Sequence, residues 1–172
     1  PEFKSKPDRA HTLFSNFKRP VFVYLGRIAI EKNIEEFLKC SLLGTKLIIG
    51  DGPLRNTLEK KYKNIAHFVG YKKGEELVNM LSSCDVLVFP SRTDTFGLSI
   101  IEAMACGLPV AAHNVVGPQD IISDGVDGFL DENLERAALN CLKLSGEACR
   151  QKSILYSWES STQKFVDNLI FS

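Results

Sequence analysis

Residues 86–112 read VLVFPSRTDTFGLSIIEAMACGLPVAA, and this stretch decides the fold. It opens with the short apolar run Val86–Phe89, continues into the helix-forming segment Gly97–Cys106 and ends with a second short run, Val110–Ala112. Short apolar runs without strict alternation are typical of strands that are covered on both faces, as in parallel sheets. A strand, a helix and a second strand in this order predict a right-handed βαβ unit.

The same rhythm extends along most of the chain. Further strands are predicted at Val21–Leu25, Lys46–Ile49 and Ala66–Val69. Apolar positions at helical spacing predict helices around residues 34–42, 54–62, 77–84, 134–142 and 160–170. Asn33 with Glu36 resembles a capping box at the start of the first of these helices. The pattern predicts a Rossmann-like α/β fold, with a doubly wound parallel sheet, helices on both faces and a ligand site at the carboxyl ends of the strands.

Length and composition restrict the class of protein. A chain of 172 residues fits a single domain over 1–172, and 21 basic residues balanced by 21 acidic ones give no electrostatic case for a nucleic-acid partner. The five cysteines include no CxxC pair, which argues against a disulfide framework or a zinc site and favours a reducing, cytoplasmic compartment. The apolar runs are too short to span a bilayer. Because the chain opens at Pro1, we expect the native protein to begin further upstream.

Several well-known catalytic motifs do not occur in the sequence. There is no GxxxxGK[ST], HExxH, GxSxG or complete GxGxxG pattern, and the last absence disfavours a dinucleotide-dependent oxidoreductase. The segment Gly50–Pro53 holds two of the three glycines of that pattern, but a strand-to-helix turn needs the same residues. His11, His67 and His113 share no metal-like spacing, and no metal site is expected.

The helix that follows the fourth predicted strand carries the strongest signal for a ligand. Gly97 allows a ligand to approach the backbone closely, and the first amides of a helix lack partners within it and can bind a phosphate. Glu102 is the only charged residue between Gly97 and Cys106. A charge in a largely apolar helix is costly unless something pairs with it, and sugar hydroxyls would be suitable donors. A solvated helix face or a structural ion pair is the alternative.

The segment from Asp94 to Glu102 resembles the ExxxxxxxE signature of the family 4 retaining glycosyltransferases, which have the two-domain GT-B fold. Other segments are similar to motifs of that family and occur in the same order: 24–27 with 31–33, 47–53, 67–70 and 117–128. The resemblance covers about residues 20–130 and corresponds to the C-terminal, donor-binding half of a GT-B enzyme. It implies that an N-terminal acceptor domain is absent from this chain and that the isolated domain is inactive in transfer.

The resemblance also implies roles for individual residues. Arg27 and Lys32 match positions that contact the donor diphosphate, although without the motif they would be interpreted as surface charges. Asp94 matches the first glutamate of the signature, which contacts the donor sugar, and Glu102 matches the carboxylate that binds the ribose hydroxyls. The implied catalytic residues are Arg27, Lys32 and Asp94, and the implied donor-binding residues are Gly26, Gly70, Tyr71, Phe96, Gly97, Leu98 and Glu102.

The implied function is the binding of a nucleoside-diphosphate sugar for retaining transfer of a hexose, with mannose and glucose as candidates, to an unknown acceptor. Such chemistry serves cell-envelope polysaccharide or glycolipid synthesis and needs no cofactor. The sequence departs from the family at Asp94, which is one methylene shorter than glutamate, and at Val115–Asp120, where a paired glycine is usual. A non-catalytic nucleotide-sugar-binding module is the alternative.

A basic cluster lies between residues 60 and 73. It consists of Lys60, Lys61, Lys63, Lys72 and Lys73. The cluster predicts either peripheral contact with an anionic membrane at its inner face or a solvated basic surface.

Overall fold

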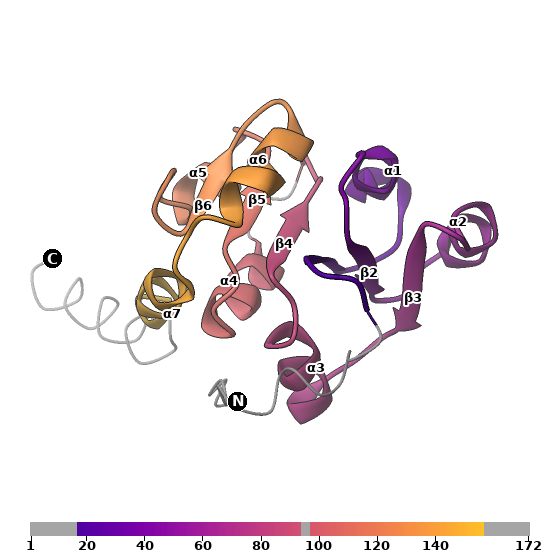
Figure 1. Ribbon diagram of the computed structural model, residues 1–172, viewed down its shortest axis with the longest axis horizontal. Helices are drawn as coiled ribbons and strands as arrows, with labels where there is room; N and C mark the ends of the chain where they lie inside the picture. The colour runs from indigo at the N-terminus through magenta and orange to yellow at the C-terminus, as the bar shows by residue number, and fades with distance from the viewer. Residues whose placement is uncertain (1–16, 94–96, 157–172) are drawn as a thin grey trace, which may run out of the picture.

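The computed structural model describes residues 17–93 and 97–156 (Figure 1). Within them, six parallel strands form one sheet in the order β3-β2-β1-β4-β5-β6. The strands are β1 (Val21–Leu25), β2 (Thr45–Ile49), β3 (Ala66–Gly70), β4 (Val86–Phe89), β5 (Val110–Ala112) and β6 (Gly128–Leu130). This arrangement confirms the predicted Rossmann-like α/β fold. The helix expected around residues 160–170 lies outside the described residues.

Helices cover both faces of the sheet. Successive strand residues point to opposite sides, so apolar side chains on both faces have to be buried. They are η2 (Ile30–Lys32), α1 (Ile34–Lys39), α2 (Arg55–Lys61), α3 (Gly74–Leu81), α4 (Leu98–Ala105), α5 (Pro118–Ile121), α6 (Leu134–Cys141) and α7 (Gly146–Ile154). In β1, Phe22 and Tyr24 join the core beneath α1, α2 and α6, whereas Val21 and Val23 join the core with α3, α4 and α7 (Figure 1). The strand residues of β1, β2, β4 and β5 are all buried, as expected for strands covered on both faces.

The chain reverses its direction of winding between β1 and β4. From β1 it proceeds outward to β2 and β3, and it then returns to β4 on the other side of β1 before continuing to β5 and β6. The loops after β1 and β4 therefore lead in opposite directions from neighbouring strands, and such a switch point is where doubly wound sheets bind ligands. Two contacts join these loops: Asn33 Nδ2 donates to Pro90 O at 3.4 Å, and Thr93 Oγ1 donates to Glu31 O at 3.5 Å.

The predicted capping box at α1 is wrong. Asn33 has a left-handed conformation (φ 52°, ψ 34°), and its side chain accepts no hydrogen bond from the first turn of α1. Its amide group instead donates to the carboxylate of Glu36. The side chain therefore connects to Glu36 directly, and the first turn of α1 is left without a side-chain cap.

The glycines of segment 50–53 serve the packing of two loops. A Cβ atom on Gly50 would lie 1.8 Å from Gly26 O, and one on Gly52 would lie 2.4 Å from Ile28 O. Hydrogen bonds hold the same loops together, since Ile28 N donates to Asp51 O at 2.8 Å. The β2–α2 loop thus packs closely against the β1–α1 loop, and the two glycines are needed because a side chain would not fit between them.

Lys46 on β2 is buried, and its ammonium group caps the end of α1. Nζ donates to Leu38 O at 2.8 Å and to Cys40 O at 2.6 Å, and it lies 5.7 Å from the centroid of the Phe37 ring. Burial lowers the pKa of Lys46 from its ordinary value, since the charged form has lost water. The two carbonyl contacts fasten the short helix α1, and with it the loop that precedes α1, to the sheet.

Candidate functional site

The β1–α1 loop presents two cations at the switch point. The Arg27 side chain is 67% exposed, and its Nη1 lies 3.9 Å from Glu31 Oε1, a distance at which an exposed pair contributes little. The Tyr24 hydroxyl donates to Arg27 O at 2.7 Å and fixes the start of the loop. Gly26 before it has a φ of 150°, and Lys32 is half-buried at the end of η2. Arg27 can therefore turn toward an anionic ligand without breaking a strong contact.

The amino end of α4 lies at the carboxyl edge of the next strand. Gly97 is the buried N-cap residue, and within the described residues no side chain caps this end of α4. Leu98 in the first turn is 65% exposed. Free backbone amides and the positive end of the helix dipole make such an end suitable for an anion. The structure thus brings Gly97 and Leu98 to the strand beside the one that leads to Arg27.

Glu102 lies in the middle of α4 and is half-buried. Desolvation raises the pKa of its carboxyl group above the ordinary value of 4.5. In the part of the chain that the structure describes, its carboxylate has no hydrogen bond and no ion pair. The alternative of a structural ion pair therefore has no partner among these residues, and the carboxylate stays available to a ligand that donates hydrogen bonds.

Two further predicted site residues, Gly70 and Tyr71, lie at the outer strand β3, two positions from β1. Gly70 (φ 77°) is the last residue of β3, and Tyr71 follows it with a side chain that is 70% exposed. Gly70 O accepts from Gly50 N at 2.9 Å, which ties this loop to the β2–α2 turn. Asp94 and Phe96 lie outside the described residues.

A polar cluster that sequence reasoning did not identify lies beside the two loops. The Glu36 carboxylate on α1 contacts Asn33, Arg92 Nη2 at 3.8 Å and the Nε2 atom of His113 at 3.0 Å. His113 directly follows β5 and is fully buried. Its position immediately after a predicted strand was the available signal, because the carboxyl ends of parallel strands meet at one edge.

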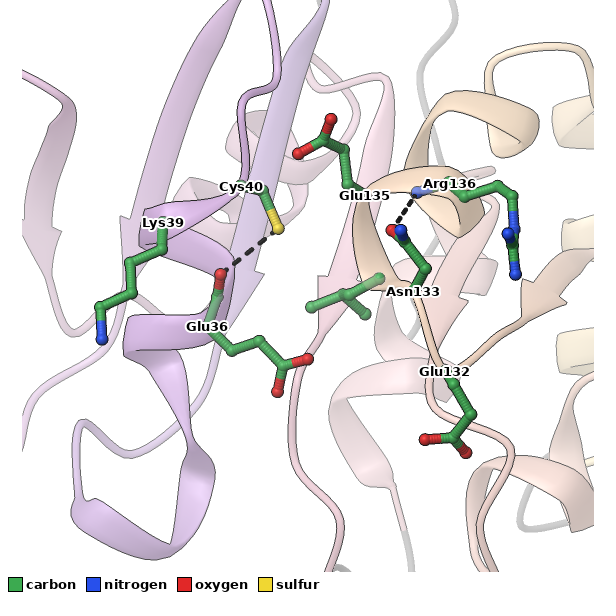
Figure 2. Close-up of a pocket in the computed structure, with 8 residues that line it drawn as sticks. Glu36, Lys39, Cys40, Glu132, Asn133, Glu135 and Arg136 are labelled. Atoms are coloured by element: carbon green, nitrogen blue, oxygen red, sulfur yellow. Dashed lines mark hydrogen bonds between the residues drawn. The ribbon is translucent and has the colours of Figure 1, made fainter.

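A hollow of about 490 Å³ lies between α1 and α6 (Figure 2). Its lining consists of Glu36, Lys39, Cys40, Glu132, Asn133, Leu134, Glu135 and Arg136. Its charged lining residues are three glutamates and two basic residues, and Asn133 accepts a hydrogen bond from Arg136 N at 3.0 Å. Among the described residues, none of the site residues predicted from the sequence lines this hollow.

Two lysines of the basic cluster are neutralised. Lys61 Nζ lies 2.6 Å from Glu35 Oε1, and Lys72 pairs with Glu76 one helical turn later. These pairs reduce the positive charge available to an anionic surface. Over residues 17–93 and 97–156, no helix is both long and apolar enough to cross a membrane, and no group of three or more His, Cys, Asp or Glu residues could hold a metal ion.

Comparison with known proteins gives a consistent family. The sequence profile described as "Glycosyl transferases group 1" matches residues 7–140. The chain is 34% identical to sulfoquinovosyl transferase SQD2 of Arabidopsis thaliana, over 95% of this chain and 36% of that protein. It is 37% identical to a GDP-mannose-dependent alpha-mannosyltransferase of Corynebacterium glutamicum, over 62% of this chain and 26% of that protein.

Solved structures agree with the fold. Sucrose-phosphate synthase of Thermosynechococcus elongatus superposes with a TM-score of 0.77 at 26% identity, over 99% of this chain and 50% of that one. Anabaena HepE in complex with UDP-glucose superposes with a TM-score of 0.75 at 21% identity, over 99% of this chain and 54% of that one. The chain therefore spans about a third of the relatives' length named above and about half of these solved chains.

Proposed function

Because the chain belongs to the group 1 glycosyltransferases, the retaining family 4 with the GT-B fold, we propose that it binds the nucleoside-diphosphate part of a sugar donor at the switch point between β1 and β4. In this proposal the β1–α1 loop holds the diphosphate through Arg27 and Lys32. The amino end of α4, at Gly97 and Leu98, receives phosphate oxygens, and Glu102 accepts hydrogen bonds from the ribose.

The observation that carries the proposal is the carboxylate of Glu102, which has no hydrogen-bond or ion-pair partner among residues 17–93 and 97–156. A half-buried carboxylate that no neighbouring residue satisfies is unfavourable in the free protein. Two adjacent ribose hydroxyls would donate to its two oxygens and replace the water that burial removed. Glu102 lies on α4, whose N-cap residue is Gly97, and this arrangement supports a ribose contact next to the phosphate contact, in the order that a nucleoside diphosphate requires.

The chemistry proposed for transfer is stabilisation of the leaving group. As the bond from the sugar to the diphosphate breaks, negative charge accumulates on the departing phosphate, and positioned cations and helix amides lower the energy of that state. Arg27 and Lys32 supply the cations, while Asp94 orients the donor sugar. This domain contributes no nucleophile in the proposal, and the hexose is transferred to the acceptor with retained configuration.

Transfer needs more protein than this chain contains. The relatives named above are about two to three times as long, and we infer that the acceptor is bound mostly by an additional N-terminal domain. Mannose and glucose are the proposed hexoses. One relative named above is GDP-mannose-dependent and one solved structure contains UDP-glucose, which supports this choice. A cytoplasmic role in making envelope polysaccharide or glycolipid, with the basic cluster near a membrane, completes the proposal.

Titration calorimetry of the 172-residue chain with UDP-glucose, GDP-mannose and ADP-glucose tests the proposal. We expect one of the three to bind with a Kd tighter than about 1 mM, which corresponds to about −4 kcal/mol. We expect no sugar transfer to a broad acceptor panel. The proposal would be contradicted if none of the three nucleotide sugars bound, or if the chain bound NAD more tightly than any of them.

A further inference from the structure

Glu36 joins the cation-bearing loop to two other loops at the carboxyl edge of the sheet. Its carboxylate accepts from the amide of Asn33, lies 3.8 Å from Arg92 in the β4–α4 loop and lies 3.0 Å from His113 after β5. These partners come from loops that follow three different strands. The Glu36 carboxylate therefore links the β1–α1 and β4–α4 loops, the two loops assigned above to the donor, in addition to the direct contacts between them.

Asn33 transmits the position of Glu36 to the cations. A left-handed backbone is unfavourable for a residue with a side chain, and asparagine tolerates it best when its side chain is held locally. Here the amide donates both to Glu36 and to Pro90 O. Since Asn33 directly follows Lys32 and ends η2, a change at Glu36 alters the direction in which Lys32 and Arg27 are presented.

His113 lies between the Glu36 carboxylate and a backbone carbonyl oxygen. Its side chain is fully buried, with Nδ1 3.3 Å from the carbonyl oxygen of Asp131 and Nε2 3.0 Å from Glu36 Oε1. The Nε2 contact has the distance of an ion pair but not the alignment of a hydrogen bond, so it is mainly electrostatic. Both oxygens can only accept, and a neutral imidazole has a single N–H. The imidazolium form places a positive charge beside the Glu36 carboxylate, and the neutral form lacks that attraction.

Among the described residues, the charged groups connected to the imidazole directly or through a chain of ion pairs come from α1, the β4–α4 loop and the junction of β6 with α6. They are Glu36 on α1, Arg92 in the β4–α4 loop, and Asp131, Glu132 and Arg136 at the junction of β6 and α6. Asp131 is paired with Arg136, and that pairing lowers the pKa of the Asp131 carboxyl group. Arg92 divides its contacts between Glu36 and Glu132. Glu36 has two cationic neighbours among the described residues, and His113 at 3.0 Å is nearer than Arg92 at 3.8 Å.

We infer that Glu36 and His113 are positioning residues for the donor site, and that the charged imidazole of His113 holds Glu36 where it orders the loop of Arg27 and Lys32. The inference rests on the proposed function. It predicts that nucleotide-sugar affinity decreases when His113 loses its charge. Neither side chain is proposed to touch the donor.

Calorimetry with UDP-glucose across the pH range in which histidine titrates tests the inference. GDP-mannose or ADP-glucose replaces UDP-glucose if the unmodified chain prefers one of them. These diphosphate esters do not change charge in that range. We expect the unmodified chain to lose at least about fivefold in affinity between about pH 5.5 and 8.5. His113→Gln should bind with the weaker, high-pH affinity throughout, and Glu36→Gln should also lose the pH dependence.

His67→Gln is the matched control, because it removes an exposed imidazole on β3 that stacks on Phe17. It should keep the pH profile of the unmodified chain. A flat profile for the unmodified chain, or an unchanged profile for His113→Gln, overturns the inference alone. Failure of the unmodified chain to bind UDP-glucose, GDP-mannose or ADP-glucose at any pH overturns the proposed function and this inference with it.

A second measurement uses the unmodified protein and does not depend on a variant folding. The His113 imidazole is titrated by NMR with and without saturating nucleotide sugar. If the donor prefers the charged imidazole, linkage requires that bound donor move the titration midpoint of His113 upward. An identical midpoint in both states overturns the inference.

Discussion

Replacing Glu102 separates a ligand role from a structural role for its carboxylate. If the carboxylate accepts two hydrogen bonds from ribose hydroxyls, Glu102→Ala removes charge-assisted bonds worth about 1.5–3 kcal/mol each. Because contributions at one site are not fully additive, we expect nucleotide-sugar affinity to fall by about one to three orders of magnitude. Glu102→Gln should show a partial loss, since its amide oxygen still accepts while its NH₂ group faces a hydroxyl that must reorient.

The same variants should leave the free protein at least as stable as before. Glu102 has no hydrogen-bond or ion-pair partner among residues 17–93 and 97–156, so removing its carboxylate leaves no donor there unsatisfied. Its pKa is raised by burial, so the folded state holds a proton to higher pH than the unfolded state does. The stabilising contribution is complete below pH 4.5 and is lost as pH rises through the folded-state pKa. At neutral pH, Glu102→Gln should therefore melt at an equal or higher temperature than the parent.

Two measurements on each variant decide the matter: Kd for the nucleotide sugar by calorimetry and Tm by scanning calorimetry. The pH dependence adds a third check, because the parent should lose stability between pH 4.5 and neutrality relative to Glu102→Gln. An affinity within twofold of the parent together with a collapse in Tm would show that Glu102 is a buried structural charge. The assignment of the donor site would then be wrong at its centre.

Other parts of the account predict further measurable effects. Arg27→Ala and Lys32→Ala should each weaken nucleotide-sugar binding by about tenfold or more with little change in Tm. The exposed control Lys60→Ala should change neither the affinity nor Tm. Equal affinities for all three variants would contradict the role of the loop. Lys46→Met should lower the free energy of unfolding by about 1–3 kcal/mol, since two carbonyls at the end of α1 lose their donor. Because burial lowers the pKa of Lys46, the unfolded state binds more protons than the folded state just below pH 10.5. The parent should therefore gain stability there as pH rises, and Lys46→Met should lack this gain. The same pH profile of stability for both proteins in urea denaturation would argue against this role of Lys46. The chain should unfold cooperatively as a monomer without a further domain, and a broad melt with dye-accessible apolar surface would count against that expectation.

The sequence predicted the sheet well wherever strands are fully buried. The runs Val21–Leu25, Val86–Phe89 and Val110–Ala112 have the bounds expected, because strands covered on both faces must be apolar throughout. Strand β6 was not predicted, since its three residues begin with a glycine and only the first is buried. Helix α7 was also missed, as Cys149 is its only buried residue and it has no apolar stripe.

The candidate site was predicted as far as single loops allow. The carboxyl-edge positions of Arg27, Gly97 and Glu102 follow from the strand–helix order, and their individual roles came from the resemblance to a family. The contact of Glu36 with His113 joins α1 to the end of β5 and depends on the packing of the two segments around β4. Local patterns carry no information about such a contact. For the same reason the capping-box interpretation of Asn33 and Glu36 identified the right pair but the wrong donor.

The central claim, that a nucleotide sugar binds between the loops after β1 and β4, is tested most directly by mapping the bound ligand onto the backbone. The measurement is a titration of the uniformly ¹⁵N-labelled chain with UDP-glucose, monitored through the amide chemical shifts. GDP-mannose or ADP-glucose is used instead if one of them binds more tightly. The account predicts saturable shifts at Gly26–Lys32 and at the first amides of α4, with the hollow between α1 and α6 unaffected. Saturable shifts confined to that hollow, or no shifts at millimolar ligand, would contradict it.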